Sequence, residues 1–599
     1  MKKHYKILIA LFVLSTQLLT AQRSGKMLFT ARLNGANERP AVATIAKGLV
    51  TVVVEGNTVT VNAVFDSLSG PVTACHFHKG AANGTGGTFT NFLTNVRGNR
   101  LYVKTTLTNA QITSMIRDSV YLNVHTAANA GGEIRGQLSL QTDGLFAVVA
   151  TGAKEVPATT SIATAVGSLV VSSTLYKVDY KIVANGLTGP ITSAHLHFGA
   201  STATGGVAFP LAFDGNVLSG SIATNQAFED SLALGKIYVN IHTAANPGGE
   251  IRGQMFYAGE GIGFDGLIDG SQQVPAVTTN AKGAMYAVVR STLDTLDYAI
   301  QTTGITPFIA HFHIGAAGVS GGVAAELKPA SAAFPGAYSG SIALTPALLA
   351  DLAKDGIYAN FHTTANQTGE IRGQVLSVLR TGLVSNICGG QEIPAVTTTA
   401  SGAGYMSLSR DKTDVTLVAV TNGLSTNATG AHVHRGEKGV NGPVIINLNT
   451  RLVGNTVSGT YNLTTVPALA DSIARGLTYF NFHNTANPNG EIRGQAATDL
   501  VQECLANATL ELNGEKFAVK ISPNPVSERL TINFNSNEQF NAQLVISDIA
   551  GRQIAVQNVA ILRGPNNLEL PMSTVNNGIY FVQMRQGNRL LFTEKVVKN

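Results

Sequence analysis

The histidines of this chain are confined to three positions that recur four times. The sequence has 13 histidines; His4 lies near its start, and the other twelve form four sets of three. Each set has a His-apolar-His pair and, further along, a histidine that ends the pattern Tyr-x-Asn-apolar-His. The twelve are His76, His78 and His125; His195, His197 and His242; His311, His313 and His362; and His432, His434 and His483. So restricted a distribution indicates a repeated site.

The spacing within each set predicts how β-strands would position these side chains. In a strand, residues i and i+2 point to the same face, about 6.5–7 Å apart. Each histidine pair therefore converges on one face, while the residue between them, such as Leu196, faces the core. By the same logic Tyr238, Asn240 and His242 share a face. If the two strands lie near each other, three imidazoles meet. Three neutral imidazoles suit copper or zinc, with a fourth position left for water or a ligand.

Three interpretations of the histidine sets stay open at this stage. The first is a copper or zinc site. The second is a hydrogen-bonded cluster with the repeated Tyr and Asn, which would fix the two strands without any metal. The third is recognition of another ligand. His-x-His alone is a weak motif, whereas three histidines in register four times over are more specific.

A second polar pattern, Gly-Glu-Ile-Arg-Gly-Gln, closes each unit. Its Glu and Arg stand at i and i+2, so they either orient a histidine from outside the ligand set or form an ion pair at a strand edge. With the repeated Asn, the predicted supporting residues are Asn123, Glu133, Arg135, Asn240, Glu250, Arg252, Asn360, Glu370, Arg372, Asn481, Glu491 and Arg493. No Ser-His-Asp order, Cys-His pair, phosphate-binding loop or carboxylate dyad repeats across the units. We therefore predict no catalytic residues for hydrolysis or phosphoryl transfer.

The elements that must carry these residues are read from the repeat itself. The third histidine of each set recurs every 117 to 121 residues, as the numbers 125, 242, 362 and 483 show, so the units are whole domains. An acidic or amide residue shortly before a proline marks each start, as in Glu155-Val156-Pro157. Short alternating runs rich in Val, Thr, Ile and Tyr predict an all-β fold, with antiparallel strands in a sandwich or barrel.

Each unit also has one predicted short helix. Thr345 and Pro346 provide an N-cap and a first-turn proline, and Gly356 closes the segment, as Gly235 and Gly476 do elsewhere. The predicted parts are a signal peptide (1–21), four repeats (26–141, 144–258, 262–379 and 381–498), a linker (499–515) and a separate C-terminal domain (516–599).

Composition and the N-terminus indicate an exported globular protein. The chain is 44% hydrophobic and 13% charged, with 63 Gly and no Trp. Its formal charge of +5 is spread thinly, without a basic stripe, so nucleic acid is not an expected partner. Residues 1–21 have a basic start, an apolar run and a small-residue end, which is the layout of a secretory signal peptide. No later segment is long and apolar enough to predict a transmembrane helix.

The three cysteines do not recur from repeat to repeat, so no disulfide framework defines the domain. Export permits disulfides, and Cys388 and Cys504 flank the fourth repeat at positions where they are candidates to pair. We expect Cys75 to be a small buried thiol.

The units resemble a known family. Glu155-Val156-Pro157, the Ala-His-Leu-His-x-Gly element at 194–199 and the closing element at 242–254 are similar to the CHRD, or chordin-type, domain over about 26–498. The resemblance implies an immunoglobulin-like β-barrel related to copper/zinc superoxide dismutase. Dismutases also carry a His-x-His strand and a later histidine among their copper ligands, which would match His76, His78 and His125. This chain lacks counterparts of the bridging histidine, the zinc loop and the conserved disulfide, which puts dismutase activity in doubt.

The last segment breaks the repeat and contains no histidine. Its Ile521-Ser-Pro-Asn-Pro-Val526, its Asp548-Ile-Ala-Gly-Arg552 turn and its Asn577-Gly-Ile-Tyr-Phe-Val582 resemble the C-terminal sorting domain of type IX secretion cargo. That resemblance implies a Gram-negative bacterium, passage through the periplasm and engagement of the type IX machinery. It further implies a protein that is released or fixed at the outer-membrane cell surface after removal of the tail.

The sequence favours a multivalent, non-enzymatic binding or structural protein, because linked weak sites gain avidity whereas catalysis gains only a fourfold site number. The extracellular ligand is unknown at this stage. The rival hypothesis is a metal-dependent, copper-type redox enzyme with superoxide-dismutase-like sites. A third hypothesis makes the repeats mere spacers.

Overall fold

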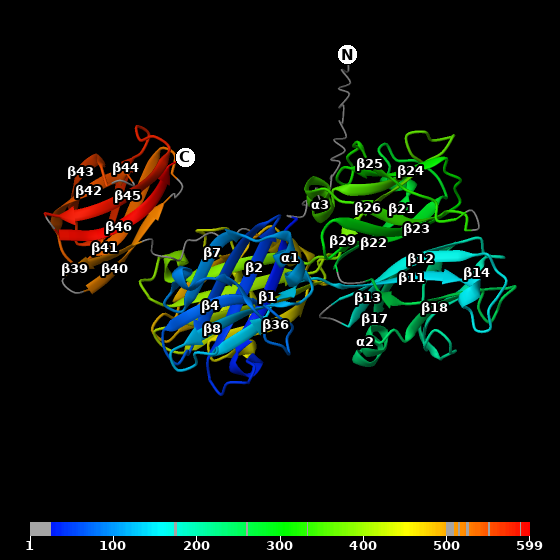
Figure 1. Cartoon of the computed structure of the whole chain (residues 1–599), viewed down its shortest axis with the longest axis horizontal. Helices are drawn as coiled ribbons and strands as arrows, with labels where there is room; N and C mark the ends of the chain where they lie inside the picture. The colour runs from blue at the N-terminus through cyan, green and yellow to red at the C-terminus, as the bar shows by residue number, and fades with distance from the viewer. Residues whose placement is uncertain are drawn as a thin grey trace, which may run out of the picture. The chain divides into compact units, whose positions relative to one another are not determined.

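The computed structural model describes residues 25–172, 176–258, 261–331, 334–498, 508–512, 515–522, 526–548, 551–587 and 589–598. The predicted signal peptide, 1–21, therefore lies outside the described residues. The chain divides into two compact units, Met1–Leu500 and Val501–Asn599. Strands are the dominant secondary structure of both units, which confirms the predicted all-β class (Figure 1).

The four repeats share one order of strands and one helix. Repeat 1 has β1 (Met27–Asn34), β2 (Lys47–Glu55), β3 (Thr58–Asp66), β4 (Val72–Lys79), β5 (Thr88–Asn91), β6 (Val96–Arg97), β7 (Arg100–Thr106), α1 (Asn109–Ile116), β8 (Val120–Thr126), β9 (Ile134–Gln137) and β10 (Ser139–Leu140). Repeat 2 has β11 (Gly144–Thr151), β12 (Thr164–Val171), β13 (Lys177–Asn185), β14 (Ile191–Phe198), β15 (Val207–Pro210), β16 (Phe213–Asp214), β17 (Val217–Ala223), α2 (Gln226–Ala233), β18 (Ile237–Thr243), β19 (Ile251–Gln254) and β20 (Phe256–Tyr257).

The second half of the repeat array follows the same plan. Repeat 3 has β21 (Gly261–Asp269), β22 (Lys282–Arg290), β23 (Thr295–Thr303), β24 (Ile309–Ile314), β25 (Val323–Glu326), β26 (Ala337–Ala343), α3 (Pro346–Ala353), β27 (Ile357–His362), β28 (Ile371–Gln374) and β29 (Leu376–Ser377). Repeat 4 has β30 (Thr381–Cys388), β31 (Ser401–Leu408), β32 (Asp414–Asn422), β33 (Ala428–Arg435), β34 (Val444–Asn447), β35 (Leu452–Val453), β36 (Thr456–Asn462), α4 (Pro467–Ala474), β37 (Thr478–Asn484) and β38 (Ile492–Ala496).

Each repeat is one antiparallel sheet that curls into a near-barrel. In repeat 1 the strand order is β5-β4-β8-β9-β1-β2-β3-β7-β6, so β5 and β6 form opposite edges. Only residues 92–95 connect β5 to β6, and so short a segment requires the two edges to approach each other. The near-barrel is thus a consequence of chain connectivity. The finer prediction of an immunoglobulin-like or dismutase-like strand arrangement stays a prediction.

The core follows the alternation seen in the sequence. In β13, Val178, Tyr180 and Ile182 are buried and pack in the core of repeat 2, while Asp179 points outward. The short helix closes one end of the barrel, with Phe228 and Leu232 of α2 buried one turn apart. Asn225 caps this helix by accepting a hydrogen bond from the Phe228 amide at 3.0 Å.

The predicted caps of α3 are confirmed in part. Thr345 is its N-cap and Pro346 opens the first turn. The left-handed residue that ends this helix is Asp355 (φ 56°), one position before the predicted Gly356. Gly235 and Gly476 do adopt positive φ after α2 and α4. Aspartate tolerates this conformation better than most residues. Here the Asp355 side chain accepts a hydrogen bond from the Ser377 amide at 2.7 Å.

The repeats pack in two pairs within the first unit. Strands β2 and β3 of repeat 1 face β31 and β32 of repeat 4. Strands β12 and β13 of repeat 2 face β22 and β23 of repeat 3 (Figure 1). Leu49, Val64 and Val418 belong to the apolar cluster between repeats 1 and 4. The contact between repeats 2 and 3 is more polar, since Lys181 donates to the buried Asp265 at 2.9 Å.

Two connections between repeats are short and largely buried. Residues 141–143 join repeats 1 and 2, and residues 378–380 join repeats 3 and 4; these two linkers pair with each other through an antiparallel bridge. Arg380, only 1% exposed at its side chain, donates to Asp143 at 2.8 Å and also bonds Asp414. The two linkers and repeat 4 therefore share a buried polar centre.

The C-terminal unit is a two-sheet sandwich. Its strands are β39 (Ala508–Leu512), β40 (Glu515–Ser522), β41 (Arg529–Ser536), β42 (Phe540–Asp548), β43 (Gln553–Ile561), β44 (Gly564–Pro571), β45 (Gly578–Gln586) and β46 (Arg589–Lys598). The sheet orders are β39-β40-β41-β44 and β43-β42-β45-β46. The region predicted as a linker, 499–515, contains β39, which pairs with β40.

The cysteine predictions have different outcomes. Cys75 is a buried free thiol, as expected, and burial raises its pKa. Cys504 lies outside the described residues, so its pairing with Cys388 stays a prediction. No helix among the described residues combines the length and the apolar character needed to cross a bilayer.

Candidate metal centre

The three histidines of each repeat come from two neighbouring antiparallel strands. In repeat 2, β14 carries His195 and His197 and pairs with β18, which carries His242. In the register, His195 lies opposite Asn240 and His197 opposite Tyr238. His242 lies opposite Ser193, next to His195 on the same face. The corresponding pairs are β4 and β8, β24 and β27, and β33 and β37.

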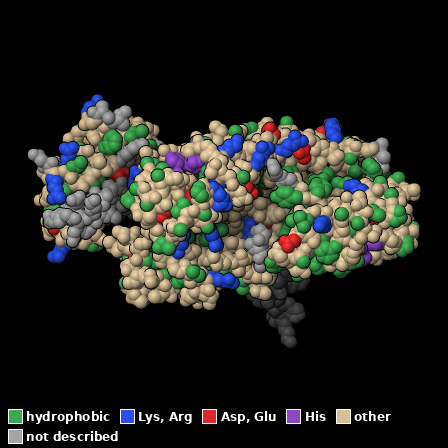
Figure 2. Space-filling model, turned by 60° about the horizontal axis from the view of Figure 1, so that its bottom comes forward, with side chains coloured by type: hydrophobic (Ala, Val, Ile, Leu, Met, Phe, Trp, Pro, Cys, Tyr) green, Lys and Arg blue, Asp and Glu red, His purple; other side chains and the backbone are tan. Residues whose placement is uncertain are grey.

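All four predicted sets of imidazoles meet at the surface of their repeats. In each set, one nitrogen from each histidine lies within 4.8 Å of the other two. The ring centroid of His195 lies 5.5 Å from that of His197 and 5.1 Å from that of His242. The first histidine of each set is partly exposed, and Figure 2 shows histidine side chains reaching the surface in small, separate patches. The structure thus brings together all twelve residues, three at a time.

Backbone carbonyls fix the tautomer of two histidines in every repeat. In repeat 2, His197 Nδ1 lies 2.9 Å from the Gly205 carbonyl oxygen, and His242 Nδ1 lies 3.1 Å from that of Pro247. A carbonyl oxygen only accepts, so both Nδ1 atoms must carry the proton and donate it. The Nε2 lone pairs are then free to point into the cluster. The other repeats have the same carbonyl contacts.

The first histidine approaches the third through its Nδ1, whereas the second and third histidines direct Nε2 into the cluster. The distance from Nδ1 of the first to Nε2 of the third is 3.2 Å in repeat 2, 3.3 Å in repeat 3 and 3.0 Å in repeat 4. Two nitrogens bound tetrahedrally to one ion at 2.0–2.1 Å lie about 3.3 Å apart. The spacing fits two ligands of one copper or zinc ion, and it also fits a direct hydrogen bond.

The electrostatics keep most of these imidazoles neutral. Burial lowers the pKa of His195, and the neighbouring His242 and His197 lower it further. The same causes lower the pKa of His432 to about 4. Burial also lowers the pKa of His242, which its bond to the Pro247 carbonyl only partly offsets. Neutral imidazole is the form that binds a metal ion, so at neutral pH protons compete weakly for these nitrogens.

The arginine of the closing motif supports the second histidine through a stack of planar groups. The His197 ring stacks on Tyr238, with centroids 4.9 Å apart and planes 11° apart. The Arg252 guanidinium also lies over the Tyr238 ring, 3.5 Å from its centroid. Arg252 also donates to the carbonyls of Ala200 and Ala203, at 2.7 and 2.8 Å. It therefore fixes the glycine loop whose Gly205 carbonyl holds His197.

Gly205 could not be replaced in this loop without displacement. A Cβ at this position would lie 1.5 Å from the carbonyl oxygen of Phe198. Equivalent Cβ atoms at Gly86, Gly321 and Gly442 would lie 1.5–1.6 Å from a carbonyl oxygen. The glycine that recurs eight residues after the second histidine is thus explained by a close backbone approach.

The glutamate of the closing motif has a different role from its arginine. Glu250 is fully buried and accepts hydrogen bonds from the hydroxyls of Thr243, Thr188 and Ser161 at 2.6–2.7 Å. Burial raises its pKa, but these hydroxyls outweigh burial and the pKa is lowered overall, which keeps the carboxylate ionised. Among the described contacts, Glu250 and Arg252 have separate partners instead of an ion pair with each other. Glu250 ties the end of β18, beside His242, to two loops.

The predicted asparagine faces a residue that sequence analysis used only as a marker. Asn123 donates to Glu38 at 3.5 Å, and Asn360 accepts from Gln273 at 2.6 Å. Glu38 and Gln273 are the acidic or amide residues that open their repeats. Their recurrence at one place before a proline was the available signal, but nothing in that pattern indicated a partner on a distant strand.

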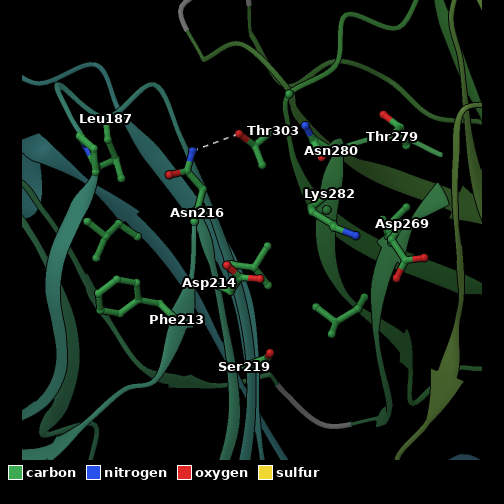
Figure 3. A pocket seen from close by; sticks show the side chains of 18 of the residues that line it. Leu187, Phe213, Asp214, Asn216, Ser219, Asp269, Thr279, Asn280, Lys282 and Thr303 are labelled. Carbon is green, nitrogen blue, oxygen red and sulfur yellow. Dashed lines mark hydrogen bonds between the residues drawn. The ribbon is translucent and has the colours of Figure 1, made fainter. Parts of the chain in front are cut away.

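A separate groove of about 1040 Å³ lies between repeats 2 and 3 (Figure 3). Phe213, Asp214 and Asn216 line it from repeat 2, and Asp269 and Lys282 line it from repeat 3. Asn216 donates to Thr303 across the groove at 3.2 Å. None of the twelve cluster histidines lines this groove.

Comparisons with known proteins agree with the repeat and the tail. The CHRD domain family matches residues 29–138, 146–255, 264–375 and 383–496, and the secretion system C-terminal sorting domain family matches residues 520–599. No curated protein matches the chain. A crystal structure of trypsin-activated alpha-2-macroglobulin from Escherichia coli shares 10% identity with a TM-score of 0.12, over 91% of this chain and 40% of that one.

The sorting domain implies export by the type IX machinery and a secreted or cell-surface location. The matched repeats cover most of the chain and contain all four histidine clusters. This protein therefore belongs to the CHRD domain family, as four tandem CHRD domains followed by a secretion system C-terminal sorting domain.

Proposed function

We propose that each CHRD domain binds one copper or zinc ion through its three histidines. The observation that carries this proposal is the set of lone pairs left without a partner. Among the described residues, Nε2 of His197, His313 and His434 is buried and accepts no hydrogen bond. In repeat 1 the same holds for Nδ1 of His76 and Nε2 of His125. Buried polar atoms are nearly always satisfied, and a metal ion would satisfy three inward lone pairs at once.

The metal-free alternative explains less. A hydrogen bond from His195 to His242 satisfies two of the three nitrogens and leaves His197 Nε2 without a partner. Moreover, two of three histidines have Nδ1 bonded to a backbone carbonyl, an arrangement that orients the ring of a metal ligand and raises its basicity. Binding would require His195 to move its proton from Nδ1 to its partly exposed Nε2.

At the level of the whole protein, we propose a multivalent binding or structural protein that works outside the cell or at its surface. The N-terminal signal peptide would direct the chain to the periplasm, and the sorting domain would engage the type IX machinery. Four equivalent sites on one exported chain favour binding over catalysis, because a partner with repeated epitopes gains affinity at each additional site. The partner is an extracellular molecule with repeated features.

A second candidate function is a copper-type redox enzyme. One observation favours it: the first histidine of each cluster is partly exposed, so a fourth coordination position would open to solvent. Catalytic metal sites keep such a position, whereas structural sites close it. Superoxide consumption by the copper-loaded chain, measured against the zinc-loaded chain, would establish this function.

Metal analysis of the full chain without its signal peptide tests the primary proposal. We expect four ions per chain after copper or zinc loading and removal of excess metal. Replacement of His195, His197 and His242 by alanine should leave three ions. The same replacement of His76, His78 and His125 is the matched control and should also leave three. A count that stays near zero, or one that the substitutions do not change while the fold is intact by circular dichroism, contradicts the proposal.

A further inference from the structure

A buried side chain with a carboxyl or amide group ends the opening segment of each repeat, next to the strand that carries the third histidine. It is Glu38, Glu155, Gln273 or Glu392 in the four repeats, and each is 4–8% exposed. Each follows a short 3-10 helix and ends it as the C-cap residue. The asparagine of the histidine-bearing strand lies beside it. Three repeats thus have an acid where the fourth has the corresponding amide.

Repeat 3 shows how this buried pair satisfies its hydrogen bonds. Gln273 Nε2 donates to Asn360 Oδ1 at 2.6 Å. Asn360 Nδ2 in turn donates to the Thr368 carbonyl at 3.1 Å. Because that carbonyl only accepts, the orientation of the Asn360 amide is fixed, with Oδ1 toward Gln273. Neither of the two facing atoms lacks a partner.

In the other three repeats, two acceptors face each other at this place. Oε1 of Glu38, Glu155 and Glu392 is buried without a donor, and so is Oδ1 of Asn123, Asn240 and Asn481. Buried acceptors are nearly always paired with a donor, and here the unpaired acceptors come as adjacent couples. Each couple consists of a glutamate Oε1 and an asparagine Oδ1, and no hydrogen atom lies between the two oxygens to form a bond.

The closing glycine locates the two acceptors relative to each other. A Cβ at Gly132 would lie 2.5 Å from Asn123 Oδ1 and 2.8 Å from Glu38 Oε1. A Cβ at Gly369 would lie 2.1 Å from Asn360 Oδ1 and 2.5 Å from Gln273 Nε2. The values at Gly249 and Gly490 follow the same order. Glu38 Oε1 therefore occupies the place that the donating Gln273 Nε2 occupies in repeat 3.

We infer that Glu38, Glu155 and Glu392 are protonated in the folded protein and donate an O–H hydrogen bond to the asparagine of the histidine-bearing strand. These three residues form proton-binding sites, and Gln273 is their non-titrating counterpart. The bound proton joins the opening segment to the strand that carries the third histidine. This inference concerns protons alone and is tested without metal, so it stands or falls independently of the proposed metal binding.

The charged groups around each carboxyl, together with its burial, determine the pH at which the carboxyl ionises. Arg135 and Arg39 face Glu38, Arg252 faces Glu155, and Arg493 faces Glu392; all favour the ionised form. Burial opposes ionisation more strongly and raises the pKa of each glutamate to about 7. Since the folded-state pKa lies above the ordinary value of 4.5, the added stability is full below 4.5 and is lost as the pH rises to 7. Repeats 1, 2 and 4 thus respond to pH near neutrality through this bond, and repeat 3 does not.

The test replaces the acid by the amide that the protein already uses in repeat 3. The triple variant Glu38→Gln, Glu155→Gln, Glu392→Gln is compared with the unmodified full chain, both freed of metal by a chelator. At pH 5 the two melting temperatures should agree closely. By pH 8 the triple variant should melt higher, because a shift from 4.5 to about 7 corresponds to roughly 300-fold in the unfolding equilibrium for each carboxyl. The variant Gln273→Glu should show the opposite trend, with a melting temperature that falls further as the pH rises.

Infrared spectroscopy provides a second measurement that does not depend on folding energetics. The unmodified chain should show a protonated-carboxyl C=O band at pH 6 that disappears by pH 9 and is missing from the triple variant. A melting difference that is constant between pH 5 and 8, or the absence of that band at pH 6, overturns the inference. Either result would mean that the asparagine amide is rotated so that its Nδ2, and not its Oδ1, faces Oε1 of an ionised glutamate.

Discussion

Replacing Arg252 by methionine should weaken metal binding by the histidine cluster of repeat 2, although Arg252 contacts none of the three histidines. The background is the full chain with His76→Ala, His311→Ala and His432→Ala, which leaves only the cluster of repeat 2 intact. Methionine fills a similar volume but neither stacks as a planar cation on Tyr238 nor donates to the Ala200 and Ala203 carbonyls. The loop that presents the Gly205 carbonyl to His197 then loses its anchor.

The magnitude follows from the bonds that are lost. Two charge-assisted hydrogen bonds, at about 1.5–3 kcal/mol each, connect Arg252 to the loop, so repeat 2 should be destabilised by about 3–6 kcal/mol. Loss of an outer support of a histidine ligand typically costs 10–100-fold in metal affinity. We therefore expect zinc or copper affinity, measured by chelator competition, to fall by roughly 10–100-fold.

Arg372→Met in the same background is the matched control. Arg372 stacks on Tyr358 at 3.4 Å and donates to the Ala316 carbonyl, but the cluster of repeat 3 has lost His311. Because Arg372 makes one such carbonyl bond where Arg252 makes two, this variant should lose about half as much stability and show no change in the metal affinity of repeat 2. If Arg252→Met lowers stability as Arg372→Met does but leaves affinity within about twofold, the support that we assign to the arginine and its loop is wrong.

Three further predictions follow from the same geometry. Gly205→Ala should abolish metal binding in repeat 2, since its Cβ would meet the Phe198 carbonyl oxygen at 1.5 Å. Gly206→Ala is the control because a Cβ there meets no atom within 4 Å, and the metal content per chain is measured for both variants. In the metal-free chain, His432 should contribute a loss of stability as the pH falls from 6.5 toward 4, because burial and the neighbouring imidazoles lower its pKa to about 4. In acid melting curves the stability of His432→Gln relative to the unmodified chain should therefore rise over this range, and a constant difference would contradict the prediction. Arg380→Met should destabilise the repeat unit by about 3–5 kcal/mol in urea unfolding, because it removes the buried cation that pairs with Asp143 and Asp414. Arg290→Met, at an exposed ion pair with Asp297, should have no measurable effect.

The sequence was sufficient to predict the strands and the meeting of the histidines because both follow from a two-residue period. His195 and His197 share a face by that rule alone, and the pairing of β14 with β18 supplies the third imidazole. The rule contains no information on which ring nitrogen faces inward. That choice depends on carbonyls at Gly205 and Pro247, which a turn and a loop bring close.

Other features of the site were beyond sequence reasoning because they depend on contacts between distant segments. The motif placed Glu250 and Arg252 on one strand face and suggested an ion pair or joint support of a histidine. In the fold, the carboxylate meets hydroxyls of three other segments, and the guanidinium meets an aromatic ring and a loop. The partner of Asn123, Glu38, lies 85 residues earlier in the chain.

The packing of the repeats changes what multivalency means for this protein. Domains on flexible linkers explore many separations, and the effective concentration at the second site then depends on linker length. Here the linkers are residues 141–143 and 378–380, which hydrogen-bond each other through Asp143 and Val378 at 3.0 Å. Buried apolar faces and the Arg380 ion pairs fix the domains further. A rigid array gains avidity only from a partner whose epitopes match its spacing, so cutting a linker or loosening the array by Arg380→Met should reduce binding to an ordered surface more than binding to a single epitope.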